Sequence, residues 1–260
     1  NAAIFMDKDA YLGVGSRSWN ANSVNAWNLL GKNRVTIVPN GDCFIELNEN
    51  IILSDSQPII PTTNFGASGA QRITFYSEDT REIRIPAGGE FDLSAFGGLS
   101  NGTNQQITFD GNIRLIFEPG STLRFPGVGH SNNQKGPVLY MNGRSQLIFE
   151  GLTDRDSTRL VARNMCSTDN VTVGRSRIIG CGKIWLNKNA SMKIMDSACV
   201  GVEADSRTLE TDLLISIAKE SALLIGDPST SGGILQVGNV TDLSEGGEVF
   251  TNVYFTLRLN

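Results

Sequence analysis

The sequence contains few of the groups on which most catalytic and metal sites depend. It has a single histidine, His130, and its four cysteines form no CxxC pair. Zinc needs several nitrogen or sulfur ligands, so we expect no histidine-based metal site, zinc ribbon or redox motif. No Walker loop and no GxSxG nucleophile elbow occurs. We therefore expect neither a metal nor a cofactor.

Charge and long apolar runs are scarce as well. Charged residues make up 19% of the 260 residues, below the roughly 25% of an average globular protein. The formal net charge of −5 gives no electrostatic reason to bind a phosphate backbone, so nucleic acid is not an expected partner. No stretch approaches the ~18 apolar residues of a membrane-spanning helix, so we expect no membrane span in this chain.

Glycine and asparagine, in contrast, are abundant, and the sequence also contains a repeated pattern of apolar residues. The chain has 28 Gly and 23 Asn, the two residues that tolerate positive φ, which favours frequent turns and short strands. The pattern is two short alternating apolar strands joined by a three-residue corner and a small residue. Full matches are Ile4, Met6, Ala10, Leu12 and Val14; Leu115, Phe117, Ser121, Leu123 and Phe125; Leu139, Met141, Ser145, Leu147 and Phe149; Ile184, Leu186, Ala190, Met192 and Ile194; and Ile215, Ile217, Ser221, Leu223 and Ile225.

Such a pattern predicts an all-β protein, a single-stranded parallel β-helix (solenoid) with loop excursions. Alternation places the apolar residues on one face of each strand, and one arc alone cannot bury that face. Copies must therefore stack at the ~4.8 Å interstrand spacing and form internal apolar columns. The intervals between matches suggest coils of about 20 to 25 residues with insertions.

The main alternative is a hairpin-built sandwich or jelly roll. Alternating strands followed by turns occur in any all-β protein, but hairpins favour two-residue turns such as Asn-Gly. Most corners here lack that chemistry. Asn142-Gly143 is an exception that is able to close a hairpin.

Two segments carry helical signals. Ser23 is a suitable N-cap and Gly31 a suitable stop, so we predict a short capping helix over 23–31 that covers an open end of the solenoid. Residues 209–224 mix helix-favouring residues with strand alternation, and we predict strand there.

We expect residues 1–260 to form one solenoid domain. The alternating run from Val253 to Leu259 continues almost to the last residue, and Asn1 is not preceded by an initiator Met. The sequence therefore suggests a fragment of a longer chain, or a chain whose end pairs with another molecule.

The cysteines Cys43, Cys166, Cys181 and Cys199 are interpreted mainly as small buried hydrophobic residues. Their even number leaves two disulfides open as an alternative. Cys181 and Cys199 lie 18 residues apart, about one predicted coil, so stacking or bridging of this pair is a further option.

The template resembles the right-handed parallel β-helix of secreted bacterial adhesins, autotransporter passengers, phage tailspikes and pectin-lyase-like enzymes. The segments NASMKIMDSACVG (189–201) and ESALLIGDPSTSGG (220–233) are similar to the small-x-Leu-x-Ile-Gly arcs of surface adhesins. This resemblance implies a solenoid exposed on a cell surface or secreted.

Enzymes of that superfamily carry clustered carboxylates or a carboxylate with basic partners, and the densest such group here lies at 154–163. If the protein is an enzyme, its weak catalytic candidates are Asp154, Asp156, Arg159 and Arg163. The simpler interpretation is a solvated salt-bridged turn. His130 lies in GVGHS, similar to the Gly-His-Gly piece of polygalacturonases, but Ser131 replaces the second glycine and the other elements are absent.

The leading functional hypothesis is a non-catalytic adhesive or structural stalk or fibre segment, extracellular or on the cell surface. Its expected partners are a glycan or host-surface ligand and a further copy in a homo-oligomer or end-to-end stack. One alternative is a carbohydrate-active β-helix enzyme of the tailspike, lyase or hydrolase type. Another is a self-assembling shell or filament protein.

Overall fold

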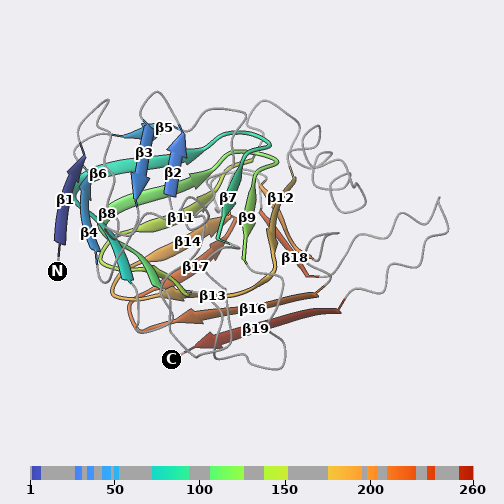
Figure 1. Cartoon of the computed structure of the whole chain (residues 1–260). Coiled ribbons are helices and arrows are strands. Elements are labelled where there is room, and N and C mark those ends of the chain that lie inside the picture. The colour runs from blue at the N-terminus through green and yellow to red at the C-terminus, as the bar shows by residue number, and fades with distance from the viewer. Residues whose placement is uncertain are drawn as a thin grey trace.

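The strands of the molecule lie in rows of parallel neighbours (Figure 1). The computed structural model describes residues 2–6, 27–30, 34–37, 43–47, 50–52, 72–93, 106–125, 138–151, 175–194, 198–203, 210–226, 233–237 and 252–259. The first row contains β1 (Ala2–Met6), β4 (Cys43–Leu47), β6 (Arg72–Ile85), β8 (Gln106–Phe117), β10 (Val138–Met141), β13 (Cys181–Leu186), β16 (Glu210–Ile217) and β19 (Asn252–Leu259), in that order.

Two further rows complete the arrangement. The second row joins the later parts of β6 and β8 with β5 (Ile51–Ile52), β11 (Gln146–Phe149), β14 (Ser191–Ile194) and β17 (Ala222–Ile225). The third row contains β7 (Glu90–Asp92), β9 (Thr122–Arg124), β12 (Arg175–Ile179), β15 (Cys199–Val202) and β18 (Ile234–Val237).

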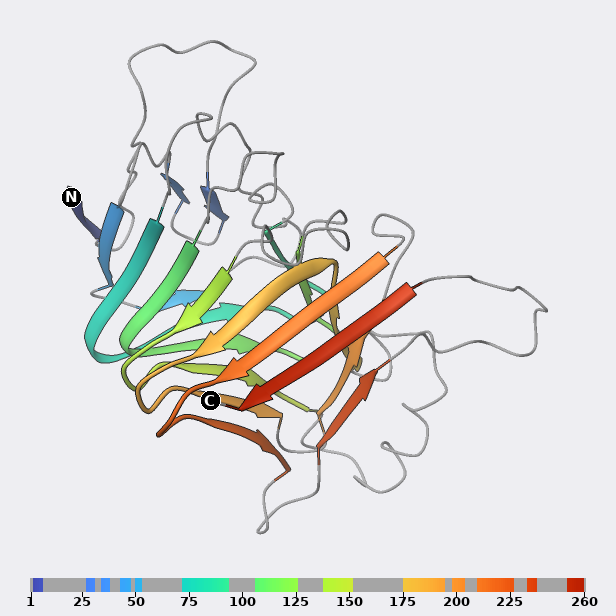
Figure 2. The ribbon, with the colours of Figure 1, turned by 90° about the horizontal axis from the view of Figure 1, so that it is seen from below.

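The chain visits the three rows in turn, and we call one such passage a layer. β10, β11 and β12 form one layer, β13, β14 and β15 the next, and β16, β17 and β18 another. Seen from below, the strands of the first row follow one another side by side, and β6 and β8 curve into the second row (Figure 2). The predicted all-β class with parallel strands is confirmed.

The hairpin that Asn142-Gly143 was able to close does not form. β10 pairs with β8 and β13, and β11 pairs with β8 and β14, so β10 and β11 do not pair with each other. The dipeptide instead turns the chain from the first row into the second, with Gly143 at φ 64°.

The predicted coil length is too short. Leu139 aligns with Ile184 and Ile184 with Ile215, which are 45 and 31 residues apart rather than 20 to 25. The prediction underestimated the repeat because each layer carries three strands, and the matched template covers two.

The predicted helix over 23–31 is wrong where the structure describes it. Trp27–Leu30 is strand β2, and it pairs antiparallel with β3 (Arg34–Ile37). Residues 23–26 lie outside the described residues. Pairing with β3 supplies backbone hydrogen bonds that outweigh the modest helix preference of a four-residue segment. The strand prediction within 209–224 is confirmed by β16 and β17.

The corners between rows are tight turns whose residues fit their backbone conformations. In the corner after β8, Ser121 donates to the carbonyl of Glu118 across Pro119 and Gly120, and Gly120 has φ 81°. A type II turn favours proline at its second position and glycine at its third. In the corresponding pattern after β10 and β13, the small residues Ser145 and Ala190 are buried, as the template predicts.

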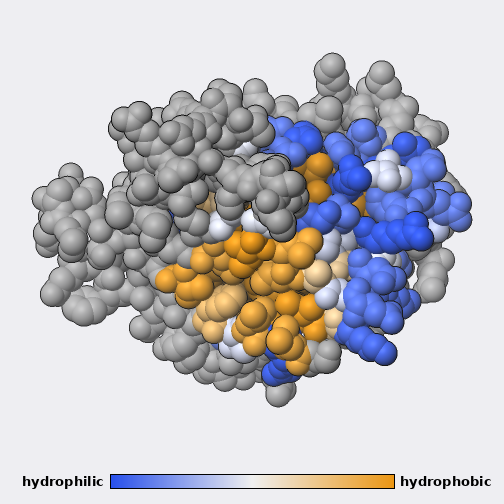
Figure 3. Space-filling model, turned by 180° about the vertical axis from the view of Figure 1, so that it is seen from behind, coloured by the Kyte–Doolittle hydropathy of each residue, from blue (hydrophilic) through white to orange (hydrophobic). Residues whose placement is uncertain are grey.

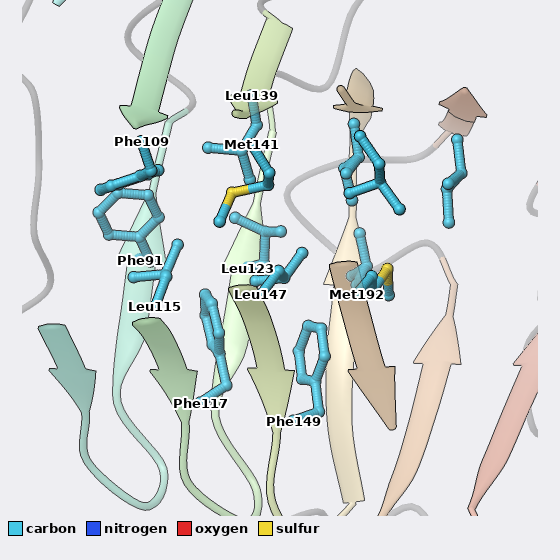
Figure 4. Packing of buried hydrophobic residues seen from close by; sticks show 14 of the residues in the cluster. Phe91, Phe109, Leu115, Phe117, Leu123, Leu139, Met141, Leu147, Phe149 and Met192 are labelled. Carbon is cyan, nitrogen blue, oxygen red and sulfur yellow. The ribbon is translucent and has the colours of Figure 1, made fainter. Parts of the chain in front are cut away.

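The core is built from columns of aligned inward side chains (Figure 4). Phe117 stacks on Phe149 with ring centroids 4.8 Å apart, and Phe91 meets Phe117 edge-on at 6.3 Å. A second stacked pair, Phe75 and Phe109, lies 5.2 Å apart. Aligned aromatic rings in successive layers therefore add ring contacts to the burial of apolar area.

The end of the stack at β17, β18 and β19 presents apolar side chains. Met141, Leu186, Ile217 and Leu259 occupy one column, and their exposed fractions are 0%, 0%, 9% and 75%. Figure 3 shows hydrophobic side chains gathered on one face of the molecule. Among the residues that the structure describes, the exposed large hydrophobic ones are Leu224, Ile225, Val237, Leu257 and Leu259.

We predict that Phe117→Ala lowers the free energy of unfolding by about 3–5 kcal/mol, because it leaves a cavity between two rings. Urea unfolding measures this change. Thr256→Ala, on an exposed position of β19, is the control and should change stability by less than about 0.5 kcal/mol. A loss below about 1 kcal/mol for Phe117→Ala would contradict the described packing.

A second prediction concerns Glu220, which has φ 68° in the corner after β16. Left-handed backbone costs a non-glycine residue about 1–2 kcal/mol, whereas glycine costs about 0.5–1 kcal/mol in chain entropy. Glu220→Gly should therefore raise the free energy of unfolding by about 0.5–1 kcal/mol. Lys219→Gly, one residue earlier and without positive φ, should lower it. Equal effects of the two changes would refute the assigned turn.

Candidate functional site

The catalytic candidates from the sequence lie outside the described residues. These are Asp154, Asp156, Arg159 and Arg163, and the same holds for His130 and Cys166. Their proposed roles therefore remain predictions.

Within the described ranges, no group of three or more His, Cys, Asp or Glu side chains is placed to hold a metal ion. The same residues contain no helix of the length and apolarity needed to cross a bilayer.

Six aligned residues form a line across the outward face of the first row, and we call this line the outer strip. Register pairs place one residue of each strand opposite the next, from β6 to β19. The outer strip consists of Thr74, Thr108, Tyr140, Trp185, Ser216 and Arg258. Neighbouring strands in a sheet lie about 4.8 Å apart, so the strip is a regular row of side chains.

Tyr140 and Trp185 stand at the middle of the outer strip. Each lies between two core residues of its strand, so its side chain points away from the core. The ring centroids are 4.9 Å apart with planes at 78°. Both side chains are half-buried. The indole Nε1 of Trp185 is buried, so what this ring offers is apolar surface.

Hydroxyl groups flank this aromatic pair. Thr108 precedes Tyr140 in the strip and Ser216 follows Trp185, and both are largely buried at 9% and 8% exposure. The strip thus combines ring surfaces with groups that donate and accept hydrogen bonds.

Charged side chains lie on the same face beside the strip. Burial lowers the pKa of Lys183, nearby Asp212 opposes this shift, and Arg258 adds to it. Lys183 thus lies near both an acid, Asp212, and a second cation, Arg258. Tyr76 lies near the β6 end of the outer strip. Its pKa is raised by desolvation and by the carboxylates of Glu78, Asp110 and Glu46.

A different group of charges lies on the outward face of the second row and its corner. Arg84 contacts Glu150 at 2.8 Å, Glu118 at 3.3 Å and Glu82 at 3.5 Å. These residues belong to three successive layers, so the guanidinium ties β6 to β8 and β11. Because the groups are partly exposed, the contribution of each pair to stability is small.

Ion pairs are more deeply buried on the outward face of the third row. Arg175 contacts Glu203 at 2.8 Å, and Arg124 pairs with Glu90. A Cβ on Gly201 would lie 2.3 Å from the Arg175 guanidinium, so glycine leaves the space that the arginine occupies. We interpret these pairs as structural, because removing one partner from a buried pair is strongly destabilising.

The described cysteines bear out the interpretation as buried small residues. Cys181 and Cys199 are buried and not joined in a disulfide. Cys181 aligns with Asp212 in the first row and Cys199 with Arg175 in the third, so the two do not stack as their spacing suggested. Cys43 lies on β4, and its side chain is outside the described set.

Burial raises the pKa of the Cys199 thiol, although nearby Arg175 opposes the shift. The reactive thiolate is therefore less populated than in a free thiol, and the sulfur is shielded from reagents. We predict that Cys199 in the folded protein reacts with iodoacetamide on the order of 100-fold more slowly than in urea. Peptide mass spectrometry measures the two rates. Similar rates would contradict its placement in the core of the fold.

Neither Tyr140 nor Trp185 was predicted as a site residue from the sequence. Both occupy the unassigned middle position of a matched strand, between Leu139 and Met141 or between Ile184 and Leu186. That shared position was the available signal, since bulky aromatics at outward sites of successive repeats align once the repeats stack.

No protein-family model, curated protein or solved structure matches the chain.

Proposed function

We propose that this chain is a non-catalytic β-solenoid, secreted or exposed on a cell surface, that serves as an adhesive or structural stalk or fibre segment and holds a glycan along its outer strip. The observation that carries this proposal is the alignment of Tyr140 and Trp185 among hydroxyl and charged groups on one outward sheet face.

The solenoid assignment is supported by the order in which the chain visits the rows. Three successive layers, from β10 to β18, repeat the same three-row path with parallel register. Each layer contributes to the same inward columns, and burial is near complete where a layer has neighbours on both sides. A stack of this kind is stiff along its axis, which suits a stalk.

The glycan assignment is supported by the chemistry of the outer strip. A sugar ring presents C–H groups on its faces and hydroxyls around its rim. Half-buried rings at Tyr140 and Trp185 suit the C–H faces, and the exposed guanidinium of Arg258 at the end of the strip suits the hydroxyls. A row of side chains with strand spacing suits a linear chain of sugars better than a single small molecule.

We predict that Trp185→Ala weakens binding to the best ligand of a polysaccharide panel by about 10-fold or more, since a central aromatic anchor is lost. Trp185→Phe, which keeps a ring, should retain most of the affinity. Isothermal titration calorimetry on the purified chain measures both effects, and circular dichroism checks the fold.

The matched control is Ile148→Ala, which removes a half-buried outward side chain from the second row. It should leave binding unchanged. Absence of binding to every neutral and acidic polysaccharide tested would refute the proposed function. Release of reducing ends or unsaturated sugars from any of them would refute the non-catalytic assignment.

A further inference from the structure

The corners that follow the first-row strands change sign of charge along the stack. In the early layers this corner holds Glu78, Asp79 and Arg81 within β6 and Asp110 within β8, and Arg81 pairs with Asp79 at 3.0 Å, so the excess charge there is negative. In the later layers it holds Arg144 after β10, Lys188 after β13 and Lys219 after β16. All three cations are exposed.

Backbone hydrogen bonds show that these corners are stacked on one another. Arg144 donates to the carbonyl of Gly111, Asn187 to that of Met141, and Ala218 to that of Leu186. The side-chain amide of Asn187 also donates to the side-chain oxygen of Asn142, 3.2 Å away. Lys188 and Lys219 are therefore neighbours in space at equivalent positions of the repeat, whereas Arg144 aligns with Asn189 and Glu220.

Positive charge is also found beside the aromatic pair Tyr140 and Trp185. Lys183 lies two residues before Trp185 on the outward face of β13, and Arg258 ends the outer strip on β19. On this face and its corners, the cations of the later half whose side chains the structure describes are Arg144, Lys183, Lys188, Lys219 and Arg258, and the acids are Asp212 and Glu220.

The spacing of these cations determines which kind of anion they bind. Layers are about 4.8 Å apart, whereas the Debye length at physiological ionic strength is about 8 Å, so fields from successive layers add. A small anion would meet one or two of these cations. A polymer with repeated negative charges would meet the whole set.

We propose that the glycan of the outer strip is anionic, a polysaccharide bearing carboxylate or sulfate groups, and that it lies along β10, β13, β16 and β19 rather than along β4, β6 and β8. This inference rests on the proposed function, because it names the ligand class of the same strip. The sugar rings contact Tyr140 and Trp185, and the acidic groups face the cations of the corners and of Lys183 and Arg258.

The state of Lys183 supports this placement. Burial lowers the pKa of Lys183, Asp212 opposes this shift and Arg258 adds to it, so the pKa remains below its ordinary value. A carboxylate or sulfate beside Lys183 stabilises the charged form of the lysine and raises the pKa again.

The test compares acidic polymers with neutral counterparts of the same backbone. The probes are polygalacturonate against its methyl ester, and dextran sulfate against dextran. Calorimetric titration at 50 and 300 mM NaCl should show binding of at least one acidic polymer, about 10-fold weaker binding of its neutral counterpart, and clear loss of affinity at the higher salt.

Charge-neutralising variants locate the site. Lys188→Gln and Lys219→Gln should each weaken binding of the acidic polymer about 2- to 5-fold, the effect of one exposed charge pair. Lys193→Gln, a matched change on the outward face of the second row, should leave the affinity unchanged. Glu78→Gln, in the acidic half, should leave it unchanged or tighten it slightly.

The outcomes distinguish the proposal that the protein binds a glycan from the proposal that this glycan is anionic. Equal affinity for acidic and neutral polymers, with loss in Trp185→Ala, would overturn the anionic assignment and retain the glycan-binding function. Acidic binding that is insensitive to Trp185→Ala and to both lysine changes would overturn both. Single-stranded DNA binding with equal affinity would overturn the assignment of a sugar ligand.

Discussion

The structure depends on parallel backbone pairing that keeps inward residues opposite one another, across one register shift in β6 between Ser77 and Arg81. Within each row, a residue of one strand lies opposite an equivalent residue of the next, so inward residues stay inward from layer to layer. A shift of one residue would turn a whole strand inside out, because side chains alternate between the faces. The aligned aromatic and aliphatic columns oppose such a shift in every layer, so the register and the core stabilise each other.

The same register determines which residues are available for recognition. Inward positions are committed to packing, and the third row buries its outward ion pairs, such as Arg175 with Glu203. Around Arg84 the carboxylates are already paired. The outward face of the first row differs, since it carries half-buried aromatic rings with exposed cations at its corners and at Arg258. That difference is why we place the site there.

Much of this architecture was predictable from the sequence, and the failures have physical causes. Alternation and the small residue after each corner predicted the strands, the parallel class and buried residues such as Ser145. The predicted helix was wrong at Trp27–Leu30 because pairing partners outweigh local propensity in so short a segment. The aromatic pair was missed because outward positions have no periodic signature in one strand. Their significance arises only when stacking brings two repeats together.

Stacking also sets how firmly each part of the molecule is held. A layer in such an array is stabilised by its own contacts and by those with its two neighbours, so an end layer with one neighbour is held less firmly. The column that ends at Leu259 shows the accompanying change in burial, because its exposure rises only in the last strands. Tyr140 and Trp185 lie on β10 and β13, each paired on both sides. The proposed binding surface therefore sits on strands that the stack holds rigid, which limits the entropy lost when a ligand binds.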